Sequence, residues 1–151
     1  MRRLFILAAL LAALMPSAAL AAGPHAATGG GHGTVDGTTA FSQFGFGVTV
    51  DAEGNVRGHF NCLMAGASQF PGFDLMAVRG RVTSAVISGD TATFDGIGMF
   101  QTGNQGKSQA TFHVVVTEGE TGVGTLQLTL ETPFLFVLPT EHVLNGQIRI
   151  D

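Results

Sequence analysis

The chain has 151 residues, and its seven basic and eleven acidic residues give a net charge of −4. An acidic chain without a run of basic residues is a poor binder of nucleic acids and of anionic membrane surfaces. Cys62 is the only cysteine, so no internal disulfide can form.

The first 21 residues have the layout of a cleavable, helical signal peptide. Arg2 and Arg3 precede the apolar run from Leu4 to Met15, and Ala19-Leu20-Ala21 places small residues before a cut. The alternative is a transmembrane anchor, which needs about 20 apolar residues. This run is shorter, so we expect a protein exported to the periplasm or the outside of the cell, with no membrane span after cleavage.

Residues 22–37 are rich in glycine and predict a flexible lead without packing power. His25 and His32 lie in this segment, and His59, His113 and His142 follow later. None of the five has a spacing typical of a metal site, so we expect neither a metal nor another cofactor.

Residues 38–151 form the predicted domain, and their apolar residues recur with a period of two. This alternation is typical of half-buried β-strands, and no stretch of helical period and useful length interrupts it. The sequence therefore predicts an all-β domain, an antiparallel meander of about seven to nine strands. Its apolar face must be buried by closure into a complete or nearly complete barrel, which we favour, or by folding into a β-sandwich.

Three predicted hairpins have consistent faces. Their loops are Ala52-Glu53-Gly54, Ser88-Gly89-Asp90 and the longer segment from Glu118 to Gly124. Each loop length sets inward residues opposite inward residues. The expected inward pairs are Val50 with Val56, Phe46 with Phe60, Val86 with Ala92, Val82 with Gly96, and Val116 with Leu126.

Several of these segments together resemble the post-COAP-type β module of bacterial extracellular proteins. The segments that carry the resemblance, across roughly Gly29 to Asp151, are Phe44-Gly45-Phe46, Gly54-Asn55-Val56-Arg57-Gly58, the stretch from Ser88 to Phe94, Val114-Val115-Val116-Thr117 and the ending from Asn145 to Ile150. The turn Glu118-Gly119-Glu120 lacks the family's Asp-Asn pair and proline. The resemblance implies an exported accessory domain and provides no catalytic residues.

The inward phenylalanines form one candidate site. All twelve aromatic residues are Phe, which has no polar group and mainly fills space. An interior cavity would make them the lining of an apolar-ligand site, whereas tight packing would make them a core. The candidate lining residues are Phe46, Phe60, Phe94, Phe100 and Phe112.

The outward residues Arg57, His59 and Asn61 form a second candidate site, on the surface. The predicted register places His59 beside the bare Gly47, which leaves room for a ligand. The ordinary alternative is a set of solvated strand residues.

A cross-strand ion pair is also expected on the outer surface. The predicted register sets Asp95 opposite Thr83 and diagonal to Arg81, within reach of its charge. The same register places His113 opposite Thr129.

Two apolar segments, residues 69–76 and 133–139, interrupt the alternation. They predict either loops that plug an open end of the barrel, which we favour, or a lid or partner patch. Cys62 lies at an inward position and is expected to be a small buried hydrophobe rather than a link to another chain.

The chain has no Gly-x-Ser-x-Gly motif and no evident Cys-His pair. We therefore expect a non-enzymatic exported domain that acts by surface or partner interaction. The alternatives are a small barrel that binds an apolar ligand and, third, an enzyme. The partner is an unidentified protein or a small apolar molecule.

Overall fold

The computed structural model describes residues 24–35, 41–65, 75–103, 106–120 and 123–151. The predicted signal peptide, residues 1–21, and most of the apolar segment 69–76 lie outside these ranges. No helix in the described ranges is long and apolar enough to cross a membrane. The nine strands are β1 His25–Thr34, β2 Phe41–Val50, β3 Val56–Ala65, β4 Leu75–Ser88, β5 Thr91–Thr102, β6 Ser108–Thr117, β7 Thr125–Glu131, β8 Leu135–Val137 and β9 Glu141–Ile150.

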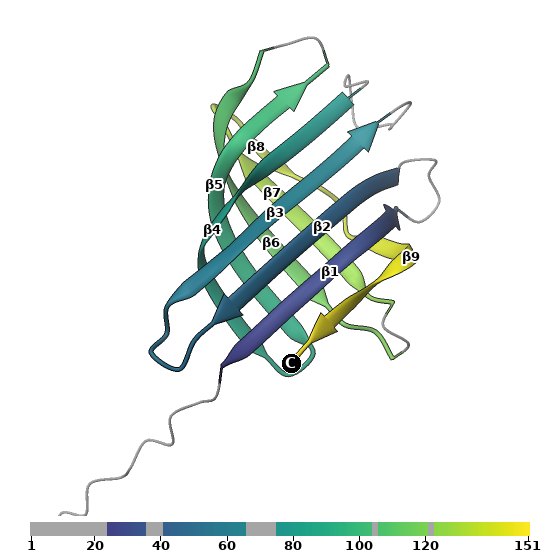
Figure 1. Cartoon of the computed structure of the whole chain (residues 1–151). Helices are drawn as coiled ribbons and strands as arrows, with labels where there is room; N and C mark the ends of the chain where they lie inside the picture. Colours follow the sequence, from purple (N-terminus) through teal and green to yellow (C-terminus); the bar gives the residue numbers. More distant parts are fainter. Residues whose placement is uncertain (1–23, 36–40, 66–74, 104–105, 121–122) are drawn as a thin grey trace, which may run out of the picture.

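All nine strands belong to one antiparallel sheet, with the order β6-β5-β4-β3-β2-β1-β9-β7-β8. The additional pairing of β6 with β7 closes a ring of hydrogen bonds through eight strands, and β8 lies outside that ring (Figure 1). The prediction of an all-β antiparallel sheet that closes on itself is thereby confirmed, and the alternative of two separate packed sheets is not what forms.

Within the ring, β7 and β9 share the fewest paired residues. Only Thr125 with His142 and Leu126 with Glu141 pair there. Further along β9, the backbone N–H of Ile150 donates a hydrogen bond to Oε2 of Glu118, at 2.8 Å. The Glu118 side chain thus binds a backbone N–H at the edge of β9 that no described strand pairs.

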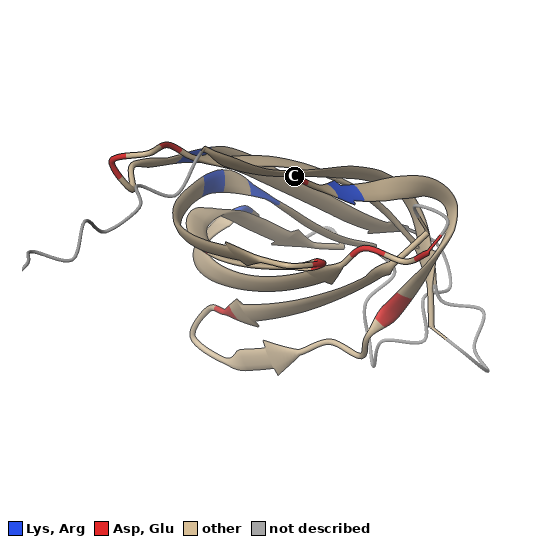
Figure 2. Ribbon diagram, turned by 90° about the horizontal axis from the view of Figure 1, so that it is seen from below, with Lys and Arg blue, Asp and Glu red and all other residues tan. Residues whose placement is uncertain are grey.

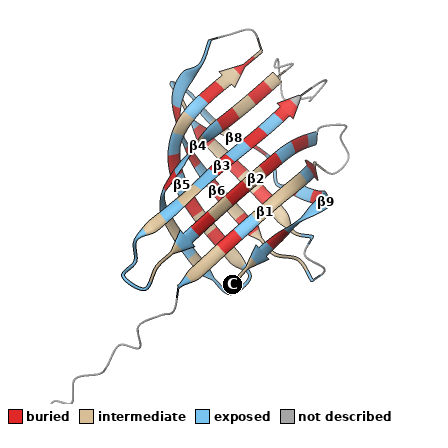
Figure 3. Cartoon of the chain, viewed as in Figure 1, coloured by how far each residue is buried: buried red, intermediate tan, exposed pale blue. Residues whose placement is uncertain are grey.

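Burial alternates along each strand, as the period of two predicts (Figure 3). In β6, for example, Phe112, Val114 and Val116 are buried, and His113 between them is exposed. The buried apolar residues of the eight ring strands form one core inside the ring. This core supplies the main stabilising term for the fold, because burial of apolar side chains drives folding.

The first predicted hairpin, between β2 and β3, is confirmed. Val50 pairs with Val56 and Phe46 with Phe60, in the predicted register. Gly54 has φ of 83°, a backbone conformation that favours glycine. Asn55 donates backbone and side-chain hydrogen bonds to the Asp51 carboxylate, which fixes the loop.

The predicted register of the β4–β5 hairpin is wrong beyond Val82. A bulge between Val82 and Ser84 shifts the pairing, so Ile87 rather than Val86 is opposite Ala92. Val86 is consequently 69% exposed. A bulge adds one residue to its strand and reverses the faces of the residues beyond it. Ser88 therefore pairs with Thr91, which leaves a loop of two residues, Gly89 and Asp90.

The expectation of a flexible lead over residues 22–37 is wrong for His25–Thr34. These residues form β1, which pairs with β2 on one side and with β9 on the other. Glycine fits there for a steric reason: a Cβ at Gly29 would lie 2.7 Å from Cζ of the Phe46 ring. The glycines of β1 thus make room for a core side chain and complete the ring.

Candidate functional site

The five candidate phenylalanines are buried, but they do not line one site. Phe60 contacts Phe94 and Phe112, with ring centroids 6.0 and 5.3 Å apart, and Phe46 contacts Phe94 at 5.4 Å. These distances are those of directly packed rings. Phe100 lies apart from them and contacts Phe136. Four of the rings therefore pack on one another as core residues do.

A buried polar cluster, missed by the sequence analysis, consists of Ser42, Cys62 and Glu141. Glu141 at the start of β9 is 2% exposed and accepts a hydrogen bond from the Ser42 hydroxyl of β2, which is 0% exposed. Burial raises the pKa of Glu141, and the bond from Ser42 opposes that rise in part. Burial, with the nearby Glu141 charge, also raises the pKa of Cys62 far above its usual range.

This cluster is unsuited to nucleophilic chemistry. A thiol reacts as its thiolate, and a raised pKa keeps Cys62 protonated. Cys62 is 3% exposed and free, as expected for a small buried hydrophobe. The sequence does not single out Glu141, because a lone carboxylate at the start of a strand is usually solvated.

The surface candidates Arg57, His59 and Asn61 are exposed on the outer face of β3, as predicted. His59 pairs with Gly47 of β2 and with Arg81 of β4. A Cβ at Gly47 would lie 3.3 Å from Cε1 of His59, so the imidazole lies over the bare backbone of the glycine. The structure thus places the three predicted residues together, beside arginines of β4.

The expected pairing of Asp95 is wrong. The bulge sets Asp95 opposite Ser84 rather than Thr83, and its ion pair is with His113 of β6, Nδ1 to Oδ1 at 2.6 Å. The Ser84 hydroxyl donates to Oδ2 at 2.8 Å. The hydrogen bond with His113 is the main cause that lowers the pKa of Asp95. His113 does pair with Thr129, as predicted.

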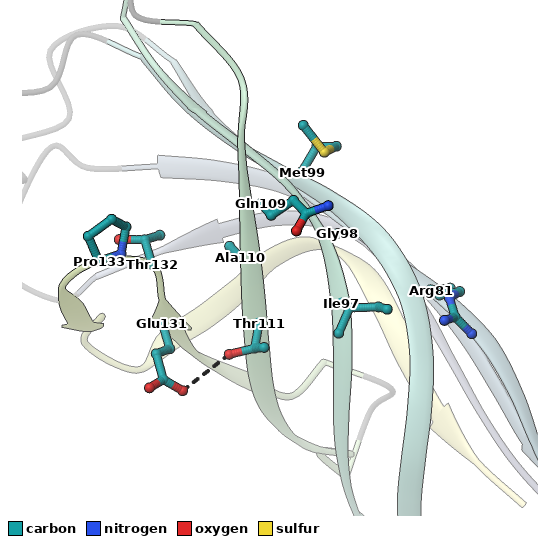
Figure 4. Close-up of a pocket in the computed structure, with 10 residues that line it drawn as sticks. All are labelled: Arg81, Ile97, Gly98, Met99, Gln109, Ala110, Thr111, Glu131, Thr132 and Pro133. Atoms are coloured by element: carbon teal, nitrogen blue, oxygen red, sulfur yellow. Dashed lines mark hydrogen bonds between the residues drawn. The ribbon is translucent and has the colours of Figure 1, made fainter.

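A groove lies next to this ion pair, on the outer face of β5, β6 and the β7–β8 turn (Figure 4). It has a volume of about 800 Å³. Ile97, Met99 and Pro133 contribute apolar surface, and the Thr111 hydroxyl donates to Glu131 at 3.3 Å between them. A smaller pocket of about 240 Å³ shares Ile97, Thr111 and Glu131 with the groove and extends it to Asp95 and His113.

The apolar segment 133–139 does not plug the ring, and that expectation is wrong. Phe134, Leu135 and Val137 are 72, 67 and 63% exposed. Only Phe136 and Leu138 face the core, because β8 alternates like the other strands. β8 pairs with β7 alone, so in the described chain its outer edge has no neighbouring strand. The exposed residues lie beside the groove, since Leu135 also lines the smaller pocket.

The described residues include no group of three or more His, Cys, Asp or Glu side chains that would hold a metal ion. Asp95 and His113 form a pair, and Glu141 is enclosed with a serine. Comparisons of the chain with protein-family models, with curated proteins and with solved structures find no match. The functional argument therefore depends on the surfaces themselves.

Proposed function

We propose that the chain is an exported, non-enzymatic domain that acts by contact between its outer surface and a partner protein. The surface concerned, termed here the β8 patch, consists of the exposed side chains beside the groove: Ile97, Met99, Phe134, Leu135 and Val137. The leader-like first 21 residues and the resemblance to post-COAP-type modules support export. The phenylalanines pack on one another in the interior, which supports binding at the outer surface rather than inside the ring.

The observation that carries this proposal is the concentration of exposed apolar side chains near a strand edge that no described strand pairs. Contiguous apolar surface costs free energy in water and usually marks a contact site. An open β-strand edge offers backbone N–H and C=O groups that an extended segment can pair with. β8 combines both features, and Phe134 and Leu135 are each more than 60% exposed.

The partner chemistry follows from this geometry. A segment added to the β8 edge would be extended and would place every second side chain toward the β8 patch. Apolar side chains at these alternate positions would contact Leu135 and Val137. We therefore propose that the partner supplies an extended segment with alternating apolar residues.

Selection from a displayed library of random peptides tests this proposal on the full chain. We expect the bound peptides to converge on apolar residues at alternate positions. The substitution Leu135→Asp should lower their affinity at least tenfold, because it places a charge where an apolar contact forms. Isothermal titration with the selected peptides measures the change.

Leu144→Asp is the matched control. Leu144 is 68% exposed, against 67% for Leu135, but it is the extra residue of the bulge in β9. The control should bind the selected peptides within twofold of the parent chain. Peptides without alternation, or equal losses in the two variants, would rule out the β8 patch as the contact site.

A further inference from the structure

The outer face of β9 and β1–β4, which continues into the groove at β5, carries four exposed arginines. Arg57 lies on β3, Arg79 and Arg81 lie on β4, and Arg149 lies on β9. Figure 2 shows the Lys and Arg segments gathered in the upper part of that view, whereas Asp and Glu segments also occur in the lower part. The sequence gives no hint of this group, since the arginines are spread over more than 90 positions.

The register aligns these arginines with polar and glycine residues in two rows across five strands. Each row runs from β9 through β1, β2 and β3 to β4. At about 4.8 Å between strands, a row extends about 19 Å along the sheet. The arginine face comprises the row Arg149, Thr28, Gly47, His59 and Arg81, and the row Gln147, Gly30, Gly45, Asn61 and Arg79.

The positive charge of the arginine face is only partly neutralised by its neighbours. In the described part of β9 and β1–β4, no outward strand position carries a carboxylate, and none of the four arginines forms an ion pair. Asp51 and Asp151 lie beyond the strand ends, and Asp95 of β5, diagonal to Arg81, is paired with His113. Hydrogen bonds from Asn55 and, to a lesser degree, the charge of Arg57 lower the pKa of Asp51, so Arg57 is partly compensated.

The middle of the arginine face has few protruding side chains, and those present are polar. A Cβ at Gly45 would lie 3.2 Å from Oδ1 of Asn61, so this amide, like the His59 ring, lies over a glycine of β2. On β1, Gly30 adds no side chain, and Thr28 is exposed. An extended ligand can therefore approach the sheet between Arg149 on one flank and Arg79 and Arg81 on the other.

We propose that the arginine face binds an acidic polysaccharide, a chain of sugars that carry carboxylates. The arginines would bind the carboxylates, for which the planar guanidinium has the matching geometry. Asn61, Gln147 and Thr28 would bind the sugar hydroxyls. The arginine face adjoins the groove, because Arg81 and Arg79 pair with Ile97 and Met99 of β5. The exposed side chains of β8 lie farther away, beyond β6 and β7.

The composition of the face favours a polysaccharide over other anionic polymers. Protein interfaces normally bury apolar anchor residues at their centre. The two rows contain none from β9 to β4, and the apolar Ile97 and Met99 that follow on β5 lie at the border of the face. Single-stranded nucleic acids bind by stacking on aromatic rings as well as by charge, and the face has only His59 for this purpose. A polysaccharide with hydroxyl and carboxylate groups would find a binding residue for both: the arginines for the carboxylates and the amide and hydroxyl side chains for the sugar hydroxyls.

Isothermal titration of the full chain with polygalacturonate tests the proposal. Binding should occur at low ionic strength and weaken as salt is raised, because exposed charges are screened. Arg81→Gln should weaken it about tenfold, while neutral dextran should not bind. Lys107→Gln removes the same charge outside the arginine face, and it should bind within twofold of the parent chain, as should Leu135→Asp.

Three results would overturn the proposal. One is the absence of polygalacturonate binding at low salt to a chain whose thermal unfolding shows it to be folded. Another is binding of poly-glutamate or single-stranded DNA at least as tight as that of polygalacturonate, which would assign the face to a different polymer. The third is an equal loss in Lys107→Gln and Arg81→Gln, which would show that only net charge matters.

Discussion

At the scale of single residues, the buried Glu141 makes the stability of the fold depend on pH. It lies inside the ring, 2% exposed, with Ser42 as its hydrogen-bond donor. Its raised pKa means that the folded chain holds the proton more tightly than the unfolded chain. This contribution to stability is complete below the ordinary pKa of 4.5 and is lost as pH rises through the raised value.

Asp95 acts in the opposite direction. His113 and Ser84 lower its pKa, so its contribution is present above the ordinary value of 3.8 and is lost as pH falls. Because His113 and Asp95 are 46 and 53% exposed, solvent screens their pairing and keeps the effect small. Of these two carboxylates, the enclosed Glu141 therefore has the larger effect on stability above pH 4.5.

Glu141→Gln should raise the free energy of unfolding at pH 8 by about 1–3 kcal/mol, the usual scale for an incompletely compensated buried polar group. The amide can still accept the Ser42 hydrogen bond, and it has no charge to desolvate. Urea unfolding followed by circular dichroism from pH 4 to pH 8 measures the change. Glu53→Gln, in the exposed β2–β3 loop, is the control and should leave the dependence of stability on pH unaltered. If Glu141→Gln were less stable at pH 8 than the parent chain, the buried carboxylate would be favourable where it lies.

At the scale of strands, glycines decide where the large core rings fit. Gly80 of β4 and Gly96 of β5 face inward beside Phe112. A Cβ at Gly80 would lie 2.8 Å from Cε1 of that ring, and one at Gly96 would lie 2.5 Å from Cε2. Such distances are closer than carbon atoms approach without a shift. These glycines are therefore part of the core packing.

Gly96→Ala should lower the free energy of unfolding by about 1–3 kcal/mol or more, the cost of an overpacked core. Gly106→Ala is the matched control, because nothing lies within 4 Å of a Cβ at Gly106. Thermal unfolding of the two variants compares them directly. Equal melting temperatures would mean that Phe112 adjusts without cost, against the packing described.

Strand predictions succeed where the alternation of apolar residues is strong. β2, β3, β6 and β7 each carry large apolar residues at every second position, and loop length sets their registers. β1 has no such pattern, because its inward positions must be small to admit Phe46. The β4 bulge was also not predicted, because nothing in the sequence distinguishes its extra residue. That residue changes the face on which Val86 lies.

The candidate sites were predictable to different degrees. Arg57, His59 and Asn61 follow from one hairpin, so their common face is readable from the sequence. Arg149 joins that face only through the pairing of β1 with β9, a contact between the two ends of the domain. Among the described strands β8 has a neighbour on one side only, and no local pattern encodes the resulting exposure of Leu135 and Val137.

At the scale of the whole molecule, the ring encloses packed side chains and leaves two distinct outer surfaces. Phe60, Phe94 and Phe112 contact one another inside. The β8 patch and the arginine face lie outside, and they adjoin where Ile97 and Met99 of β5 pair with Arg81 and Arg79 of β4. The central claim is therefore that the chain binds through its exterior and that its interior serves stability alone.

Native mass spectrometry of the protein purified from its own host tests that claim most directly. Under conditions that preserve non-covalent complexes, the account predicts a mass equal to that of the polypeptide, alone or in complex with other macromolecules. The contradicting result is a small apolar molecule that stays bound in the native spectrum and is released when the chain unfolds, because only an interior with room for a ligand would hold it.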